Sequence, residues 1–291
     1  MPLNILTRGG SSAELVRHGS GETFGLPEDG QMTVELQDVA FSYHDAGDPV
    51  ISGINLTLDR PGLYCIVGPN GVGKSTLIKC INKLNRPTAG KVLINGWDTR
   101  ELSLKDIAKY IGYVPVTTFD VFSMPVIDAI LLGAKSESKW KTTDADLEMA
   151  TRVMKMLGIE DLAMRGFNQL SAGQHQKVAI CRGLIQKPKM LILDEPTANL
   201  DVKHQVYVTE LLRGLADSSG MIVLMISHDL NVAAKYAHQI IVMSPPGVIS
   251  RIGPPEDVIT EELVSELYDI ECTVTQDEGR PHVILGSARS I

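Results

Sequence analysis

The sequence predicts an α/β domain built around a mostly parallel sheet. Short, continuous apolar segments such as Met190–Leu193 and 221–226 alternate with helix-like segments through most of the chain. Strands that are apolar along their whole length are typical of parallel sheets covered by helices on both faces. The earlier segments 33–41 and 53–58 alternate apolar and polar residues instead, which predicts a smaller N-terminal antiparallel β subdomain. The stretch 126–165 has helical spacing only and predicts a helical insertion.

The composition is that of an ordinary globular protein. Of its 291 residues, 44% are hydrophobic and 21% are charged, and the formal net charge is −8. A chain of this length buries roughly 75% of its unfolded surface, so its core needs no disulfide or metal. The four cysteines lie far apart without a CxxC pair, which predicts a reducing, cytosolic compartment and no structural zinc. The acidic balance argues against a nucleic-acid partner.

The apolar patterning excludes two classes of protein. The longest apolar runs, such as 221–226, fall far short of the roughly 20 residues that a membrane-spanning helix needs. Residues 1–31 lack the apolar centre of a secretory signal. They are rich in glycine and serine and show no hydrophobic period, so we expect a flexible leader there.

The elements can be placed in order after this leader. Following the two alternating strands, 62–67 is apolar throughout and predicts a buried strand, and 74–84 predicts a helix. A short strand is expected at 92–94, between two turn signals. Helices follow at 128–134 and 144–157, the second opened by the capping candidate Thr143. Beyond them, strands at 190–193, 221–226 and 239–243 alternate with helices at 176–186, 203–215 and 231–237.

We therefore expect three parts in the chain. A leader (1–31) precedes one domain (32–250), which carries a helical subdomain at about 116–168, and a short acidic tail follows (251–291). Residues 255–291 hold nine acidic residues against two arginines, so the tail carries most of the net charge. We expect this tail to be solvated and peripheral.

The clearest motif follows the buried strand at 62–67. Residues 68–75 satisfy G-x-x-x-x-G-K-[ST] between a strand and a helix, which is the context that a phosphate-binding loop requires. Its glycines let backbone N–H groups close around phosphate oxygens, Lys74 supplies a positive charge, and the Ser75 hydroxyl can bind Mg²⁺. The expected nucleotide-binding residues here are Gly68, Pro69, Asn70, Gly71, Gly73, Lys74, Ser75 and Thr76. The motif predicts a P-loop NTPase fold and a site for ATP and Mg²⁺.

Two adjacent carboxylates follow the apolar strand Met190–Leu193. Strand ends at this edge of an α/β sheet are where ligands bind. Asp194 would hold Mg²⁺ through water, and Glu195 would act as the general base on the attacking water, a role typically worth roughly 10²–10⁴ in rate. Taken alone, the pair would read as a solvated turn before Pro196. The phosphate loop favours the catalytic interpretation.

The order of five motifs resembles that of ATP-binding-cassette (ABC) ATPases over about residues 32–250. These motifs are the phosphate loop, Leu170-Ser-Ala-Gly-Gln174, Leu193-Asp-Glu-Pro196, Ala198-Asn-Leu-Asp201 and Ser227-His228-Asp229. The resemblance implies ATP hydrolysis in a head-to-tail dimer of two such subunits. Each site would combine Lys74 of one chain with Ser171 and Gly173 of the other.

The resemblance also assigns roles to residues outside the phosphate loop. His228 would contact the γ-phosphate and orient the Glu195 water, and Asp201 would link the two sites across the dimer. Ser171 and Gln174 fit a capping box, so an ordinary capped helix is the alternative at that motif, as a plain N-cap is for Asp201. Tyr43 resembles the adenine-stacking aromatic, but it shares a strand face with Phe41, which leaves a core role open.

One position departs from the family pattern. After Ile111-Gly-Tyr-Val-Pro115 the family has a glutamine, and this chain has Val116. Valine can neither bind Mg²⁺ nor hydrogen-bond water. The hydroxyls of Thr117 and Thr118 could substitute through a one-residue slip. We expect ATP binding to be retained and hydrolysis, or its coupling to transport, to be weakened.

A single phosphate loop without a membrane span means that the chain would dimerise and borrow a pore from separate membrane permease subunits. The tail looks like that of the ATPase subunits of iron–siderophore, haem and cobalamin importers. This implies transport fed by a substrate-binding protein, with the chain placed peripherally on the cytoplasmic face of the membrane. Two alternatives remain: a soluble non-transport ABC ATPase, and a slow or non-hydrolytic ATP-gated clamp because of Val116.

Overall fold

The computed structural model describes residues 30–44, 47–116, 124–134, 142–198 and 200–288, and the backbone of two paired strands near the N-terminus. These two strands are β1 (Val16–Arg17) and β2 (Thr23–Phe24). Apart from them, the leader expected at 1–31 lies almost wholly outside the described residues, as do Thr117 and Thr118.

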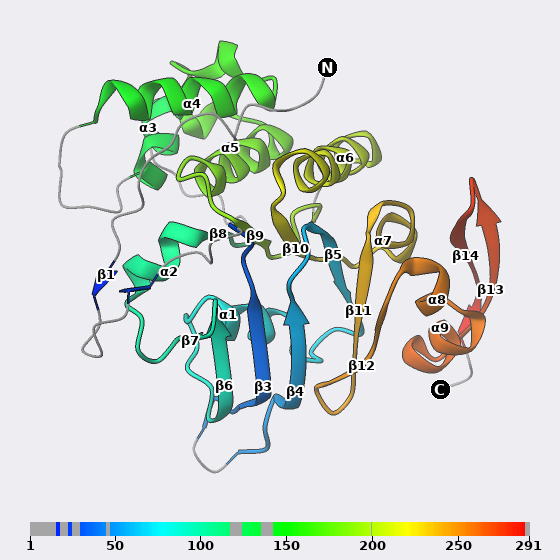
Figure 1. Cartoon of the computed structure of the whole chain (residues 1–291). Helices are drawn as coiled ribbons and strands as arrows, with labels where there is room; N and C mark the ends of the chain where they lie inside the picture. The colour runs from blue at the N-terminus through cyan, green and yellow to red at the C-terminus, as the bar shows by residue number, and fades with distance from the viewer. Residues whose placement is uncertain are drawn as a thin grey trace.

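A six-stranded sheet in the order β12-β11-β5-β10-β9-β8 forms the centre of the molecule (Figure 1). Five strands run parallel, and β12 pairs antiparallel with β11 at one edge. The strands are β5 (Gly62–Val67), β8 (Ile111–Val114), β9 (Met190–Leu193), β10 (Ile222–Ile226), β11 (Gln239–Ser244) and β12 (Val248–Gly253). Every residue of β5, β9 and β10 is buried, as continuous apolar strands predict.

The two faces of this sheet are covered by different layers. Alternate residues of β5 divide between them, with Leu63 and Cys65 in one core and Tyr64 and Ile66 in the other. The first core is closed by α5 (Ala172–Leu184), α6 (Val202–Ser219) and α7 (Leu230–Tyr236). The second is closed by α1 (Lys74–Ile81), α2 (Leu104–Tyr110) and a second sheet. Both faces of the central sheet are therefore covered and shielded from water, as is typical of parallel sheets.

The second sheet is antiparallel, in the order β4-β3-β6-β7, and lies below the central sheet in Figure 1. Its strands are β3 (Val34–Phe41), β4 (Ile51–Leu58), β6 (Ala89–Ile94) and β7 (Trp97–Asp98). Burial alternates along most of β4, so one face packs on the core and the other faces solvent. The expected fold class, an α/β P-loop fold with an antiparallel subdomain, is confirmed in this arrangement.

The helical insertion lies above the sheet in Figure 1. It contains α3 (Val126–Leu131), a 3₁₀ turn (Leu132–Ala134) and α4 (Asp144–Met156). Thr143 caps α4 in a capping box with Asp146, as the sequence predicts. The apolar face of α4 packs on α3 and α5 and joins the same core as the sheet.

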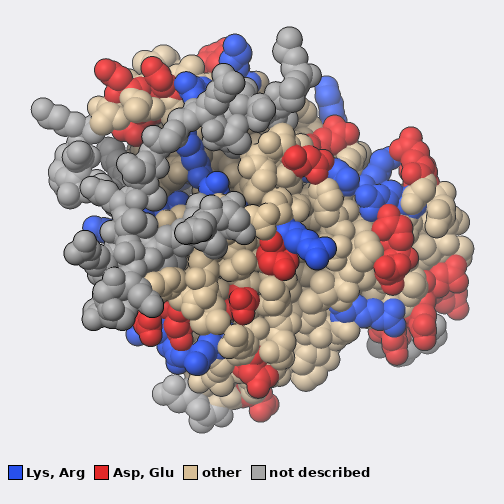
Figure 2. Space-filling model, in the orientation of Figure 1, with Lys and Arg blue, Asp and Glu red and all other residues tan. Residues whose placement is uncertain are grey.

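The last segment folds onto the domain. Helices α8 (Pro255–Val258) and α9 (Glu261–Tyr268) lead into the hairpin of β13 (Ile270–Asp277) and β14 (Arg280–Ala288). Strand β12 spans positions 250 and 251, where we expected the domain to end. Val264 and Val283 are buried in the first core, on the side of the central sheet covered by α5, α6 and α7. Acidic side chains gather along the outer edge of this last segment (Figure 2). Within the described part of the chain, no helix combines the length and apolar character needed to cross a membrane.

Candidate functional site

The phosphate loop and the residues predicted to act beside it meet at one end of the central sheet, where three neighbouring parallel strands end. Ile226 of β10 pairs with Ile66 of β5, and Met225 pairs with Leu193 of β9, so the three strands end close to one level. The segments that follow them carry the phosphate loop, His228, and the carboxylates Asp194 and Glu195. This is the edge at which α/β sheets bind ligands.

The phosphate loop is held in a conformation that only glycine fits at two points. Gly68 has φ +149°, and a Cβ there would lie 2.2 Å from the carbonyl oxygen of Met243. Gly73 has φ +101°, and its Cβ would lie 2.5 Å from Ile51 Cγ2. At both glycines the loop therefore packs directly against other residues of the same domain, with no room for a side chain. Helix α1 begins at the end of the loop, with Lys74.

Lys74 is buried beneath this loop. Its Nζ donates hydrogen bonds to the carbonyl oxygens of Gly68 and Pro69 at 2.7 and 2.8 Å. Burial lowers the pKa of Lys74, and the nearby carboxylates Glu195 and Asp194 oppose that shift. The flexible ammonium is thus held among the backbone groups that would surround a phosphate, next to the two acids.

Ser75 and Asp194 form the second part of the site. The Ser75 hydroxyl donates to Asp194 Oδ1 at 3.0 Å, across a sequence separation of 119 residues. Burial raises the pKa of Asp194, and the Ser75 hydrogen bond works against this rise. A hydroxyl and a carboxylate oxygen facing one point are hard oxygen donors of the kind that Mg²⁺ takes. The residues present therefore fit the ion that the motif requires.

Glu195 and His228 form the third part. His228 Nε2 lies 2.6 Å from Glu195 Oε1, and both side chains are partly exposed. His228 follows β10 and Glu195 follows β9, so two adjacent strand ends bring together an acid and an imidazole. A carboxylate fixed in this way is positioned to accept a proton from a bound water.

Tyr43 lies beyond the end of β3 and is 59% exposed, so it is not a core residue. Its hydroxyl lies 3.2 Å from the Thr76 hydroxyl, and its ring packs edge-on against Phe41 with centroids 4.9 Å apart. The expected strand face ends at Phe41. The exposed ring therefore stands beside the start of α1, where a base attached to a bound phosphate could stack on it.

The structure places Ser171, Gly173 and Gln174 in a separate cavity of about 190 Å³, away from the phosphate loop. Ser171 caps α5 in a capping box with Gln174, as predicted. Asp201 caps α6. His204 was not among the sequence-predicted residues, yet its ring contacts Asp201 and lines the same cavity.

Comparisons with known proteins agree with this geometry. The model of a family described as ABC transporter matches residues 51–198, slightly more than half of the chain. An ABC transporter ATP-binding protein of Methanocaldococcus jannaschii is 38% identical over 87% of this chain and 98% of its own. The chain belongs to the ABC transporter family. It is an ATP-binding subunit of the ABC type, an ATPase that uses ATP with Mg²⁺.

Two further similarities bear on this ABC subunit. The iron(3+)-hydroxamate import ATP-binding protein of Bacillus subtilis is 32% identical over 79% of this chain and 87% of its own. A solved ATP-binding cassette, a dimer in a post-hydrolysis state with ADP and Pi, superimposes with a TM-score of 0.67 at 29% identity. It covers 76% of this chain and 98% of its own. Dimeric cassettes of this kind support a second ATPase subunit as a partner.

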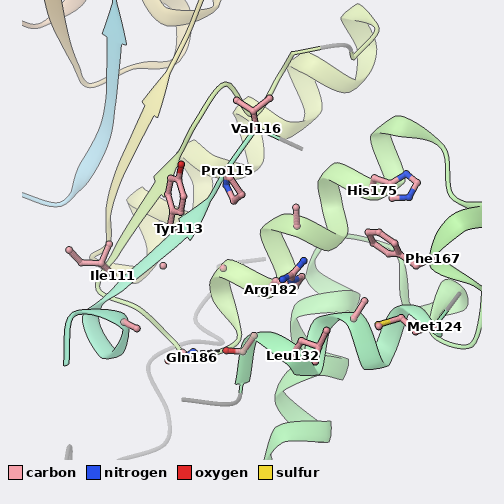
Figure 3. A pocket seen from close by; sticks show the side chains of 16 residues that line it. Ile111, Tyr113, Pro115, Val116, Met124, Leu132, Phe167, His175, Arg182 and Gln186 are labelled. Carbon is pink, nitrogen blue, oxygen red and sulfur yellow. Dashed lines mark hydrogen bonds between the residues drawn. The ribbon is translucent and has the colours of Figure 1, made fainter. Parts of the chain in front are cut away.

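The ABC subunit also has a groove of about 510 Å³ between β8 and the helical insertion (Figure 3). Pro115 and Val116 line one side, and Phe167, His175 and Arg182 line the other. Val116 is 41% exposed and follows β8, the strand beside β9. The sequence singled out Val116 but not the groove, because much of the wall opposite Val116 comes from Phe167 and from α5, more than 50 residues away in the chain.

Proposed function

We propose that this subunit energises import of iron complexes, haem or cobalamin through a separate membrane permease, working as a dimer on the cytoplasmic face of the membrane. One observation carries the hydrolytic part of the proposal. Lys74, the Ser75–Asp194 pair and the Glu195–His228 pair occupy three adjoining strand ends. These are the parts that phosphoryl transfer to water needs.

In the proposed reaction, Glu195 is the general base. It accepts a proton from the water whose oxygen bonds to the γ-phosphorus as the bond to ADP breaks. His228 holds the carboxylate through Nε2 at 2.6 Å, and it would also contact the γ-phosphate. Lys74 and the backbone N–H groups of the loop stabilise negative charge on the phosphate oxygens.

The proposed Mg²⁺ residues are Ser75, which would bind through its hydroxyl, and Asp194, which would bind through water. Mg²⁺, when bound, neutralises charge on the β- and γ-phosphates. Burial raises the pKa of Asp194 and so disfavours its ionised form. A cation bound nearby would stabilise the ionised carboxylate.

The remaining proposed residues act on the nucleotide from two sides. Tyr43 would stack on adenine within the same chain, and such stacking is worth roughly 1–3 kcal/mol. Ser171 and Gly173 would reach the γ-phosphate from the partner, because they line a cavity separate from the phosphate loop of their own chain. Gln174 and Asp201 belong to the same partner-facing surface. The positive end of α5 favours an anion at this point.

We assign the groove beside Val116 to the permease. It runs from the end of β8, adjacent to the Asp194 strand, to α3 and to α5, the helix that Ser171 caps. A short cytoplasmic segment of a membrane subunit seated there would touch both halves of the composite ATP site. The importer type rests on the tail pattern and on the similarity to a hydroxamate import subunit.

Coexpression with candidate membrane permease subunits from the same genome tests this function. We expect the chain to copurify with the permease and, in proteoliposomes, to hydrolyse ATP faster when a ferric hydroxamate-loaded binding protein is present. Glu195→Gln should abolish turnover and retain ATP binding. A maltose-loaded binding protein is the matched negative control. Turnover without any permease association would favour a soluble ABC ATPase instead.

Val116 supports a second candidate, a slow ATP-gated clamp. Val116→Gln restores a side chain that can bind Mg²⁺ and water at the exposed end of β8. We expect Val116→Gln to raise kcat several-fold with little change in ATP affinity, measured at several Mg²⁺ concentrations. Equal turnover and equal Mg²⁺ dependence in the two proteins would contradict an effect of this position.

A further inference from the structure

His204 makes more contacts with Asp201 than a helix cap requires. The Asp201 carboxylate accepts the backbone N–H of His204 at 2.9 Å, which is the ordinary capping bond at the start of α6. The His204 ring turns back onto the same carboxylate, with Nδ1 2.8 Å from Oδ1 and 2.9 Å from Oδ2. These bonds lower the pKa of Asp201 and fix the plane of its carboxylate.

Another edge of the same ring faces the start of α5. A Cβ placed on Gly173 would lie 3.0 Å from His204 Cδ2, so the imidazole lies against the bare backbone of this glycine. The ring also lines the 190 Å³ cavity that contains Ser171 and Gln174. His204 thus touches both motifs that face the partner in the proposed dimer.

One turn further along α6, a second contact joins the same two helices. Lys177 Nζ of α5 lies 4.3 Å from the centre of the Tyr207 ring, and the Tyr207 hydroxyl donates to the carbonyl oxygen of Leu157 at 3.3 Å. The start of α6 is therefore attached to α5 at two successive turns, and the second contact also reaches the end of α4 through Leu157.

We propose that His204 is a positioning residue that ties the Asp201 carboxylate to the start of α5, so that Asp201, Ser171 and Gly173 reach the partner's nucleotide as one unit. This inference rests on the composite site proposed above. It assigns to His204 a task that a plain helix cap does not have. A misplacement of about 1 Å in such a unit can cost about 10²-fold in rate.

Substitutions at His204 in the full-length chain test the link. His204→Ala should lower kcat about tenfold and leave the affinity of the separate chain for ATP unchanged, because Lys74 and the phosphate loop are untouched. His204→Asn should recover most of the rate, since its amide nitrogen occupies the place of Nδ1. His204→Gln should not, since its amide lies one bond further out. His282→Ala, an exposed histidine of β14, is the matched control.

Hydrogen exchange without nucleotide gives a readout that does not depend on turnover. His204→Ala should speed exchange of the amides at 201–204 and at 172–175 together, and His204→Asn should not. Faster exchange at 201–204 alone, or equal kcat for His204→Ala and the natural chain, would overturn the inference. If the natural chain does not hydrolyse ATP, but His204→Ala still speeds exchange at 201–204 and 172–175 together, the result counts against the proposed function. The link through His204 then stands.

Discussion

At the scale of single residues, Glu195 shows how the backbone orients the side chain that we propose as the general base. Its φ of +51° lies in the left-handed region, which costs a non-glycine residue of order 1–3 kcal/mol. The conformation is fixed on both sides, because Asp194 N–H donates to Val114 O at 2.8 Å and Ala198 N–H donates to Glu195 O at 3.1 Å. The strained residue is the one whose carboxylate meets His228.

His238 has a structural task at the opposite end of the sheet. Its Nδ1 accepts the Leu63 N–H at 2.9 Å, and its Nε2 lies 2.9 Å from Asp217 Oδ1. The ring must be neutral to accept at Nδ1. Burial lowers the pKa of His238, Arg213 lowers it further, and Asp217 opposes the shift.

This predicts that acid destabilises the fold through His238. Below the usual histidine pKa of about 6.5, His238 takes up a proton in the unfolded chain but stays neutral in the folded chain, where its pKa is lower. The free energy of unfolding therefore decreases as the pH falls from about 6.5 through the lowered pKa of the folded state. His238→Asn keeps an acceptor near the Nδ1 position and does not titrate. We expect urea unfolding of His238→Asn to depend less on pH between about 5 and 7 than that of the natural chain.

His282→Asn is the control for this prediction, because it makes the same substitution at an exposed histidine of β14. Identical slopes for the natural chain and His238→Asn would mean that other groups set the acid sensitivity.

At the scale of elements, the Asn231 side chain joins α7 to the last hairpin through two hydrogen bonds. Asn231 Oδ1 accepts the Val283 N–H at 2.7 Å, and its Nδ2 donates to Val283 O at 3.1 Å. Lys235 of the same helix contacts Asp277 and Glu278 at 3.4 Å, but these pairs are exposed. The part-buried amide should therefore outweigh the ion pairs.

We expect Asn231→Ala to lower the free energy of unfolding by about 1–3 kcal/mol, because it removes two hydrogen bonds and leaves backbone groups of β14 unpaired. Lys235→Ala should cost less than about 1 kcal/mol. Urea unfolding measures both, and limited proteolysis should cut the hairpin first in Asn231→Ala. A larger loss in Lys235→Ala would show that charge, and not the amide, holds the hairpin.

Elements were predictable where local pattern decides them. The buried strand Gly62–Val67 and the capped start of α4 at Thr143 follow from apolar continuity and capping chemistry. Strand β8 has only four residues and directly follows α2, so neither leaves a clear period in the sequence. The final hairpin was also missed, because its acidic, half-exposed strands read as a solvated tail, while its inner face is buried through contacts with α7 and α9.

At the scale of the whole molecule, the same limit applies to the site. The phosphate loop was predictable, because one strand–loop–helix segment forms it. The Ser75–Asp194 contact could be expected from the order of motifs, but not its 3.0 Å distance. The contact of His204 with Gly173 and the groove beside Val116 depend on how the helical insertion packs, and no local pattern encodes that packing.

The proposed head-to-tail dimer leads to a prediction about mixtures of two inactive variants. Lys74→Ala should inactivate the phosphate loop, and Gly173→Asp should place a negative charge at the start of α5, where it repels the γ-phosphate without breaking the helix. Each variant alone should be inactive. In an equal mixture, half of the dimers combine one chain of each kind, and each of these has one intact site, so turnover should recover to as much as about a quarter of the natural rate. ATP hydrolysis is measured after the variants are mixed and allowed to exchange subunits, with each variant alone as the control. No recovery, with subunit exchange confirmed by a label, would show that Gly173 serves the site of its own chain.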